Sequence, residues 1–231
     1  MRKWLASMLT AAGLGQAEAA GEKIQHVDPN SILYSVPTIS NDLAPLDPIV
    51  DSPQPEAAQM HEDDWCQVEF FPESSLSEMQ RILTEYKAFE ISNRQMTTIK
   101  GEQYPVWRNT YVRKVTRKPL LSGDFPAEQL ARIVGGEIGP PPALFSSRSW
   151  SGRVKNGFTI RVGKNIDLYG YTAGEGIPVL AASVGANPDD QALVVAFSKL
   201  NTALGFILVD WKSQFILLGT NPDGTVQAWQ P

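Results

Sequence analysis

The sequence predicts an α+β fold, with a mixed, largely antiparallel sheet and about three helices. Segments with alternating apolar residues outnumber segments with helical spacing, and the two kinds do not alternate regularly along the chain. The chain closes with a C-terminal helix and a three-stranded antiparallel meander. Because that meander is antiparallel, we expect the helices to cover one face of the sheet. A doubly wound nucleotide-binding fold would need regular alternation of strands and helices.

Cap residues place the three helices. The capping box Ser75-x-x-Glu78 begins the first helix, Asp124 caps the second, and Asn187 with Pro188 at the first helical position begins the third. Glycines end the second and third helices. The helices are expected from residue 75 to about 91, over 126–134 with a stop at Gly135, and over 189–204 with a stop at Gly205.

Alternating apolar residues place the strands. Turn sequences at 163–165, 212–213 and 221–224 join neighbouring strands as hairpins. Three prolines at 140–142 force an extended connector. The expected strands cover 65–71, 107–115, 157–162, 166–171, 177–184, 206–211, 214–219 and 225–229.

Length and composition exclude several classes of protein. The 231 residues are 42% hydrophobic and 19% charged, which supports a folded core. No apolar run reaches the roughly 18–20 residues of a membrane-spanning helix, so no transmembrane segment is expected. The net charge of -5 argues against a general nucleic-acid binder. One cysteine, Cys66, excludes an internal disulfide and a cysteine-based zinc site.

Residues 1–19 have two competing interpretations. Arg2 and Lys3 precede a short apolar stretch and an Ala17-Glu18-Ala19 cleavage site, which is typical of a signal peptide and of a periplasmic or secreted protein. The same stretch also has one apolar helical face. That face is typical of an amphipathic N-terminal helix on a cytoplasmic or peripherally membrane-attached protein.

Residues 20–64 are expected to form an acidic, proline-rich flexible tail. They contain six prolines, nine acids and one base, a net charge of -8, and such a segment buries too little surface to fold alone. Short apolar pieces such as residues 32–34 are expected to lie on the domain as a strap. The α+β domain itself, residues 65–231, carries a net charge of +2.

The sequence indicates no catalytic residues, metal site or cofactor. Both histidines, His26 and His61, lie in the expected tail, so the domain has no histidine for general-base catalysis. Cys66 lies on an expected core strand, where an inert buried thiol is expected. The acidic run at 61–64 matches neither a calcium loop nor a zinc helix, and no phosphate-binding loop is present.

A pair of carboxylates for hydrolysis is the catalytic alternative, because such pairs meet only in the folded protein. Asp167, Glu175 and Asp210 are the candidates, since they lie on or beside expected strands. Exposure on the solvent face of the sheet explains them without catalysis.

The positive signal is electrostatic. Residues 103–123 and 138–166 contain bases and no acids, with aromatic residues between the bases. If the two stretches lie side by side, they form a basic, aromatic-bearing sheet face; if they lie apart, the bases only make exposed strands soluble. The residues expected on this face are Arg108, Tyr111, Arg113, Arg117, Trp150, Arg153, Lys155 and Arg161.

Arginine, tryptophan and tyrosine dominate protein interfaces, so we expect a non-catalytic protein-binding domain. A bacterial immunity (toxin-neutralising) protein or a secretion accessory protein works in this way, by occupying the surface of a toxin or secreted effector. A polyanion or nucleic-acid binder that uses the same basic face is one alternative, with nucleic acid relevant to a cytosolic protein. A carboxylate-dependent hydrolase is the other. The sequence indicates no oligomeric state.

Overall fold

The computed structural model describes residues 33–49, 53–54, 56–122, 126–146, 149–174 and 176–231. Several sequence predictions fall outside these residues: the two interpretations of residues 1–19, the first part of the acidic tail with His26, the helix cap at Asp124, and Glu175. In the described part of the chain, no helix is long and apolar enough to cross a membrane.

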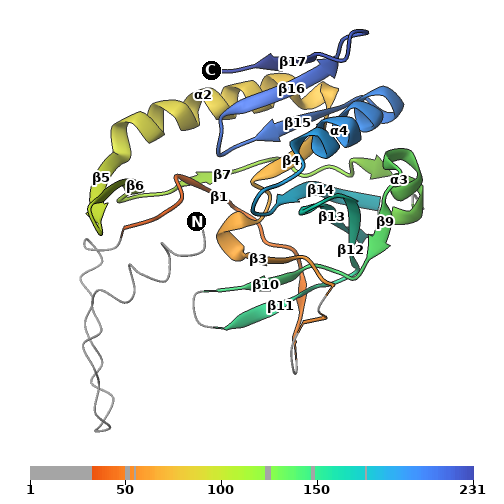
Figure 1. Cartoon of the computed structure of the whole chain (residues 1–231), viewed down its shortest axis with the longest axis horizontal. Helices are drawn as coiled ribbons and strands as arrows, with labels where there is room; N and C mark the ends of the chain where they lie inside the picture. Colours follow the sequence, from red (N-terminus) through yellow and green to blue (C-terminus); the bar gives the residue numbers. More distant parts are fainter. Residues whose placement is uncertain (1–32, 50–52, 55, 123–125, 147–148, 175) are drawn as a thin grey trace, which may run out of the picture.

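The fold is α+β, as the sequence predicts, and is organised around a nine-stranded sheet in which every neighbouring pair is antiparallel (Figure 1). The C-terminal meander forms one end of this sheet and β9 forms the other. In order across the sheet, the strands are β17 (Val226–Trp229), β16 (Phe215–Thr220), β15 (Phe206–Asp210), β4 (Val68–Pro72), β14 (Gly176–Val184), β13 (Ile166–Ala173), β12 (Gly157–Gly163) and β9 (Glu137–Gly139), with β8 (Leu121–Ser122) paired to β14.

Helices cover both faces of the sheet, where the sequence predicted one. The helices α3 (Ala127–Val134) and α4 (Asp190–Leu204) share a core with Phe70 and other side chains of one face. The long helix α2 (Leu76–Asn93) shares a second core with Phe71, on the opposite face. Phe70 and Phe71 are neighbours on β4, and successive strand residues point to opposite faces, so this one strand contributes to both cores.

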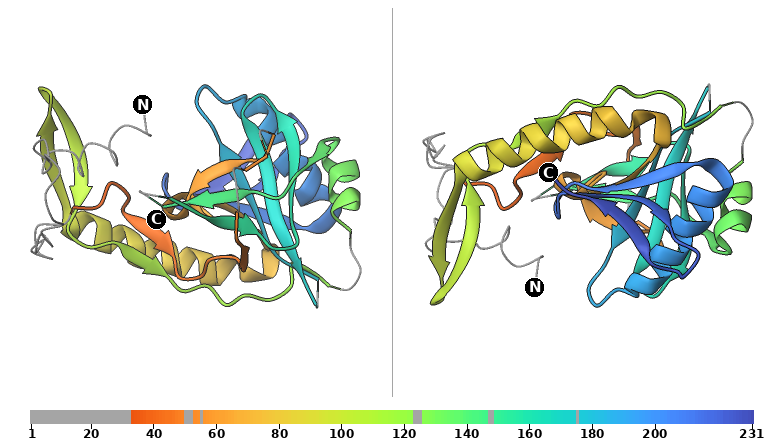
Figure 2. Two further views of the ribbon diagram at one scale, coloured as in Figure 1. Left: turned by 90° about the horizontal axis from the view of Figure 1, so that it is seen from below. Right: turned by 90° about the horizontal axis from the view of Figure 1, so that it is seen from above.

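A smaller, four-stranded sheet covers the same face of the large sheet as α2 and lies beside that helix. Its strands, in spatial order, are β2 (Leu46–Asp47), β11 (Trp150–Val154), β10 (Ala143–Phe145) and β3 (Gln59–His61). Its inner residues Leu144 and Val154 form a third core with Tyr169 of β13. The Tyr169 side chain is on the face of the large sheet that points away from the α3–α4 core. The layers are therefore two helices, the large sheet, and then α2 beside the small sheet (Figure 2).

The segment before residue 65 differs from the expected flexible tail. Strand β1 (Thr38–Ser40) pairs in parallel with β7 (Tyr111–Arg113), and β2 and β3 belong to the small sheet. Ala58 and Met60 are buried in the third core. Local composition does not reveal this packing, because the partners of these strands lie far along the chain. The packed structure therefore extends beyond the boundary expected at residues 64 and 65.

Two expected strands differ from the observed strands by more than two residues, whereas the others agree within two. The strand expected over 65–71 begins at Val68, because the chain turns through Trp65–Gln67 with Cys66 at a φ of 56°. The strand expected over 107–115 is interrupted by residues 108–110, which separate β6 (Glu102–Trp107) from β7. Strand β6 pairs with β5 (Arg94–Ile99), and this hairpin was not predicted.

The C-terminal ends of the helices agree with the predicted glycine caps more closely than the N-terminal ends agree with the predicted N-caps. Gly135 and Gly205 both cap their helices in the left-handed conformation, with φ of 75° and 67°. The capping box at Ser75 does not form, because the chain enters α2 through a 3-10 turn and the Ser75 side chain makes no cap hydrogen bond. The N-cap of helix α4 is Asp189, two residues after the predicted cap Asn187, and its side chain accepts a hydrogen bond from the Ala192 N–H.

Candidate binding surface

The structure separates the eight residues expected on one basic face into several places. Arg113 is buried and Arg117 is largely covered, with 17% of its side chain exposed. Arg161 lies at a cleft beside β9, and Arg108 is exposed in the turn between β6 and β7. Tyr111 packs beside Phe89 of α2, with ring centroids 5.6 Å apart. The residues that stay together on one exposed surface are Trp150, Arg153 and Lys155, on and next to β11.

Arg117 belongs to a buried charge network. Its guanidinium pairs with Glu69, whose side chain is 1% exposed, and its Nε lies 2.8 Å from Oδ2 of Asp42. Burial raises the pKa of Glu69, although the charge of Arg117 opposes that rise. Burial also acts on Asp42, but there the hydrogen bond and charge of Arg117 prevail and lower the pKa of Asp42. Arg117 thus joins the segment before β2 to the central strand β4.

Arg113 is 1% exposed and holds the turn before β4. Its guanidinium donates to Thr38 Oγ1 on β1 and to Gln67 Oε1, and also to the backbone oxygens of Trp65 and Cys66, at 3.1–3.5 Å. It lies 5.1 Å from the centre of the Trp211 ring. Burial lowers the pKa of Arg113 to about 10, an effect that the nearby charge of Glu69 opposes. These two arginines are structural, and an exposed basic face does not include them.

A row of three aromatic rings crosses the small sheet. In the strand register Phe145 of β10 lies opposite both Trp150 of β11 and His61 of β3. The Phe145 ring makes edge-to-face contacts with both neighbours, each at 5.5 Å. We call His61, Phe145 and Trp150 the aromatic row. Because Leu144 and Met60 point into the third core, the row lies on the other, outer face of the small sheet.

Basic side chains flank the aromatic row. Arg153 and Lys155 are exposed, whereas Val154 between them is buried in the third core, so both bases lie on the outer side. Trp150 is 37% exposed. The outer face of the small sheet therefore combines an accessible indole with two cations, one of which, Arg153, lies opposite the carboxylate of Asp47 in the strand register. Arginine and tryptophan are common in protein interfaces.

His61 is held in place within this row. Its Nδ1 accepts a hydrogen bond from the Asp63 N–H at 3.2 Å and lies 3.3 Å from the Asp63 carboxylate. Among the described side chains, no group of three or more His, Cys, Asp or Glu residues is placed to hold a metal ion. The His61 ring packs edge-to-face on Phe145, and its Nε2 atom is buried without a hydrogen-bond partner among the described residues.

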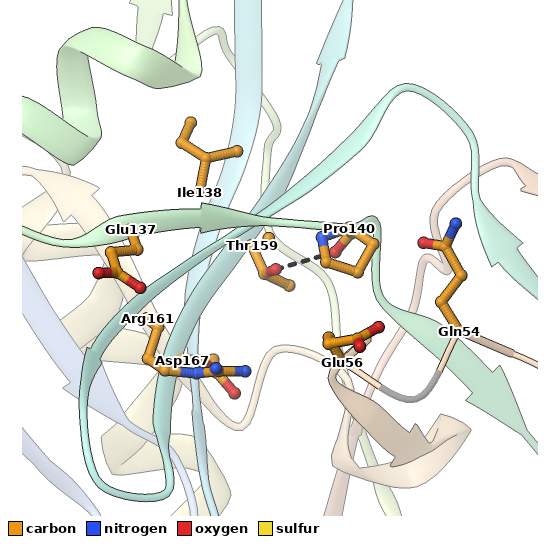
Figure 3. Close-up of a pocket in the computed structure, with 9 residues that line it drawn as sticks. Gln54, Glu56, Glu137, Ile138, Pro140, Thr159, Arg161 and Asp167 are labelled. Carbon is orange, nitrogen blue, oxygen red and sulfur yellow. Dashed lines mark hydrogen bonds and ion pairs between the residues drawn. The ribbon is translucent and has the colours of Figure 1, made fainter.

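An open cleft of about 410 Å³ lies beside the edge strand β9 (Figure 3). Arg161 of β12 lies between Glu137 and Asp167 in the strand register, and its Nε is 3.6 Å from Oδ1 of Asp167. Burial raises the pKa of Asp167, against the opposing charge of Arg161. Glu56 lines the opposite side of the cleft, so three carboxylates and one cation face the same space.

Asp210 and Cys66, the remaining candidates from the sequence, make contacts that stabilise the fold. The Asp210 carboxylate accepts a hydrogen bond from the Ser213 N–H at 2.7 Å and so closes the turn after β15. Cys66 is fully buried, and burial raises the pKa of its thiol well above the ordinary value. Its backbone N–H donates to the Tyr169 hydroxyl at 2.8 Å.

Comparison with known proteins adds no relative: no family model, no curated protein and no solved structure matches this chain.

Sequence reasoning missed His61, Phe145 and Glu137 as site residues. His61 and Phe145 are 84 positions apart and meet only because β3 and β10 pair in parallel. An apolar run directly after the prolines at 140–142 was the available signal for Phe145. No local signal marks Glu137, because its role depends on the register that places it opposite Arg161.

Proposed function

We propose that the chain is a non-catalytic protein-binding domain whose docking surface is the outer face of the small sheet. The aromatic row supports this proposal: an exposed tryptophan is backed by two further rings, with Arg153 and Lys155 beside it. A rigid aromatic anchor with a basic rim suits a protein surface that offers an apolar pocket bordered by acids.

Neutralisation of a toxin, or an accessory role in secretion, is the form of binding that we propose. Either role needs only that the domain occupies a partner's surface, and neither needs a catalytic group. A periplasmic or secreted location is part of this proposal and depends on residues 1–19.

A protein partner is favoured over nucleic acid because the basic residues of the sequence do not remain together. Arg113 and Arg117 are committed to buried contacts, and Arg161 lies beside Asp167. Two exposed cations, Arg153 and Lys155, remain beside the aromatic row. Binding to a polyanion depends on the number of phosphates or sulfates that are neutralised, so a small cationic rim supports it poorly.

Replacing Trp150 by alanine is expected to weaken binding of the partner by at least about 30-fold, because a buried aromatic anchor contributes 2 kcal/mol or more. A stoichiometric partner recovered from native cells with the full chain should be lost with Trp150→Ala. Titration of that purified partner by calorimetry then measures the change in affinity, and Arg153→Glu should also reduce the association rate.

Val195→Ala and Arg132→Glu are the matched controls, because both residues are exposed on the helices α4 and α3, away from the small sheet. These variants should bind as the unchanged chain does. The proposal is refuted if Trp150→Ala and Arg153→Glu keep full affinity, or if the recovered ligand is a nucleic acid whose binding falls steeply with salt.

A carboxylate-dependent hydrolase is the second candidate, favoured by the raised pKa of Asp167 in the cleft, since a partly buried carboxylic acid is suited to proton donation. If the cleft is catalytic, Asp167→Asn should reduce hydrolysis at least about 100-fold. Assays with chromogenic glycosides and esters measure this, with thermal unfolding as the check of the fold.

Arg161→Met is the control that removes the neighbouring charge but keeps the acid. Equal rates for Asp167→Asn and the unchanged chain exclude this candidate.

A further inference from the structure

The β5–β6 hairpin projects from the body of the protein at the end of α2 (Figures 1 and 2). Its two strands pair from Arg94 with Trp107 to Ile99 with Glu102, and the turn at Lys100 and Gly101 has positive φ at both residues. A two-stranded hairpin is only marginally stable in water by itself. Met96, near the middle of β5, is 52% exposed.

The backbone hydrogen bonds of Trp107 show which groups point away from the hairpin. Its N–H and its oxygen both bond to Tyr34, outside the β5–β6 pair. In an antiparallel pair, inward and outward groups alternate. The outward residues are therefore Gln103, Pro105 and Trp107 on β6, and Arg94, Met96 and Thr98 on β5.

The two outer edges of the hairpin differ. On β6, Tyr34 occupies the edge at Trp107, and Pro105 has no N–H to offer. On β5, the Arg94 N–H caps α2 at the Glu90 oxygen, which leaves the N–H and C=O groups of Met96 and Thr98 pointing outward. In the described part of the chain, β5 pairs with β6 alone. Among the described residues, the β6 edge is therefore closed and the β5 edge is open.

We propose that the open edge of β5 pairs with β5 of a second copy of this chain, antiparallel and centred on Met96. This register places Met96 opposite Met96 of the other copy, Arg94 opposite Thr98, and Gln95 opposite Thr97, so no like charges meet. The strand contains one base and no acid, so two copies of it can pair about a twofold axis without bringing like charges together. The paired hairpins form a four-stranded sheet in which each Met96 contacts its counterpart. This dimer contact is independent of the aromatic row.

A cysteine at position 96 tests the register. Opposite residues of this kind lie about 5.5 Å apart at Cα, a distance that a disulfide spans, so Met96→Cys should form a disulfide-linked dimer under mild oxidation. Thr98→Cys is the matched control on the same edge. In the proposed register Thr98 faces Arg94 of the other copy, so the two Thr98 residues are offset by four positions, roughly 13 Å. The native Cys66 is fully buried and does not compete.

Light scattering of the full chain provides the second measurement. The unchanged protein should have twice the mass of the 25.4 kDa chain, and Met96→Lys should be monomeric because it places two cations opposite each other. Gln95→Lys, which faces Thr97, should remain a dimer. A monomeric unchanged chain overturns the proposal and leaves the edge to another segment or protein. Equal cross-linking of Met96→Cys and Thr98→Cys also overturns it.

Discussion

Arg117→Met is expected to reduce the free energy of unfolding by roughly 3–5 kcal/mol, because it leaves the buried carboxylate of Glu69 without its cation. The Asp42 carboxylate also loses its partner, and with it the contact that joins the chain before β2 to β4. Urea unfolding followed by tryptophan fluorescence measures the loss, as a lower midpoint at neutral pH.

The loss should depend on pH in a defined direction. Burial already raises the pKa of Glu69, and without Arg117 the pKa of Glu69 rises further in the folded state. The folded variant then binds a proton that the unfolded chain has released above pH 4.5, the ordinary value, so stability falls as the pH rises. The part of the deficit that comes from Glu69 is therefore small near pH 4.5 and grows as the pH rises through the raised pKa of Glu69, whereas the part that comes from Asp42, whose pKa Arg117 lowers, is already present at pH 4.5.

Two further variants isolate the buried pair. Arg161→Met removes the cation of an ion pair whose arginine side chain is 57% exposed, and it should change the unfolding free energy by less than about 1 kcal/mol. The double variant Glu69→Leu/Arg117→Met removes both buried charges and should recover most of the lost stability. If Arg117→Met is as stable as the unchanged chain, or its deficit does not vary with pH, this account of the network is wrong.

Arg113→Met is expected to destabilise the turn before β4 by several kcal/mol. It removes the donor to Thr38, Gln67 and two backbone oxygens, and each buried acceptor left without a partner costs about 1–3 kcal/mol. The thiol of Cys66 lies in this turn and is the only thiol of the chain. Its reaction with an aromatic disulfide reagent should be fast in Arg113→Met and very slow in the unchanged protein.

Arg113→Lys should not restore this protection, because an ammonium group lacks the planar fork that reaches several acceptors and stacks on Trp211. Tyr169→Phe is the control within the same core: it removes the acceptor of the Cys66 N–H but keeps Arg113. It should expose the thiol less than Arg113→Met does. Equal protection of Cys66 in Arg113→Met and the unchanged chain would show that Arg113 does not hold the turn.

The elements that the sequence predicted well are those with local signals. Glycine at a helix end, an apolar stripe and a tight turn act within a few residues, so α4 and the C-terminal meander follow the prediction closely. All four strands of the small sheet, β2, β3, β10 and β11, were missed, because each is only two to five residues long and β2, β3 and β10 depend on a partner from elsewhere in the chain.

The candidate site was only partly predictable for the same physical reason. Alternation placed Arg113 and Arg117 on one face of a strand, but β7 ends at Arg113. An arginine that is buried against a distant acid has the same local pattern as an exposed one, and Glu69 lies 48 residues from Arg117. Trp150, Arg153 and Lys155 remained together because they follow one another on and next to a single strand.

The parallel pairing of β1 with β7, and of β3 with β10, has a consequence for how the chain acquires its structure. The first pair joins residues 73 positions apart and the second joins residues 84 positions apart. Ribosomal synthesis therefore delivers both strands before their partners: β1 remains unpaired until residue 113 has been made, and β3 until residue 145 has been made. Such non-local contacts raise the contact order and slow folding. The small sheet and its aromatic row can therefore be completed once residue 154 has been made, whereas the pairing of β4 with β15, whose residues lie up to 142 positions apart, must follow later.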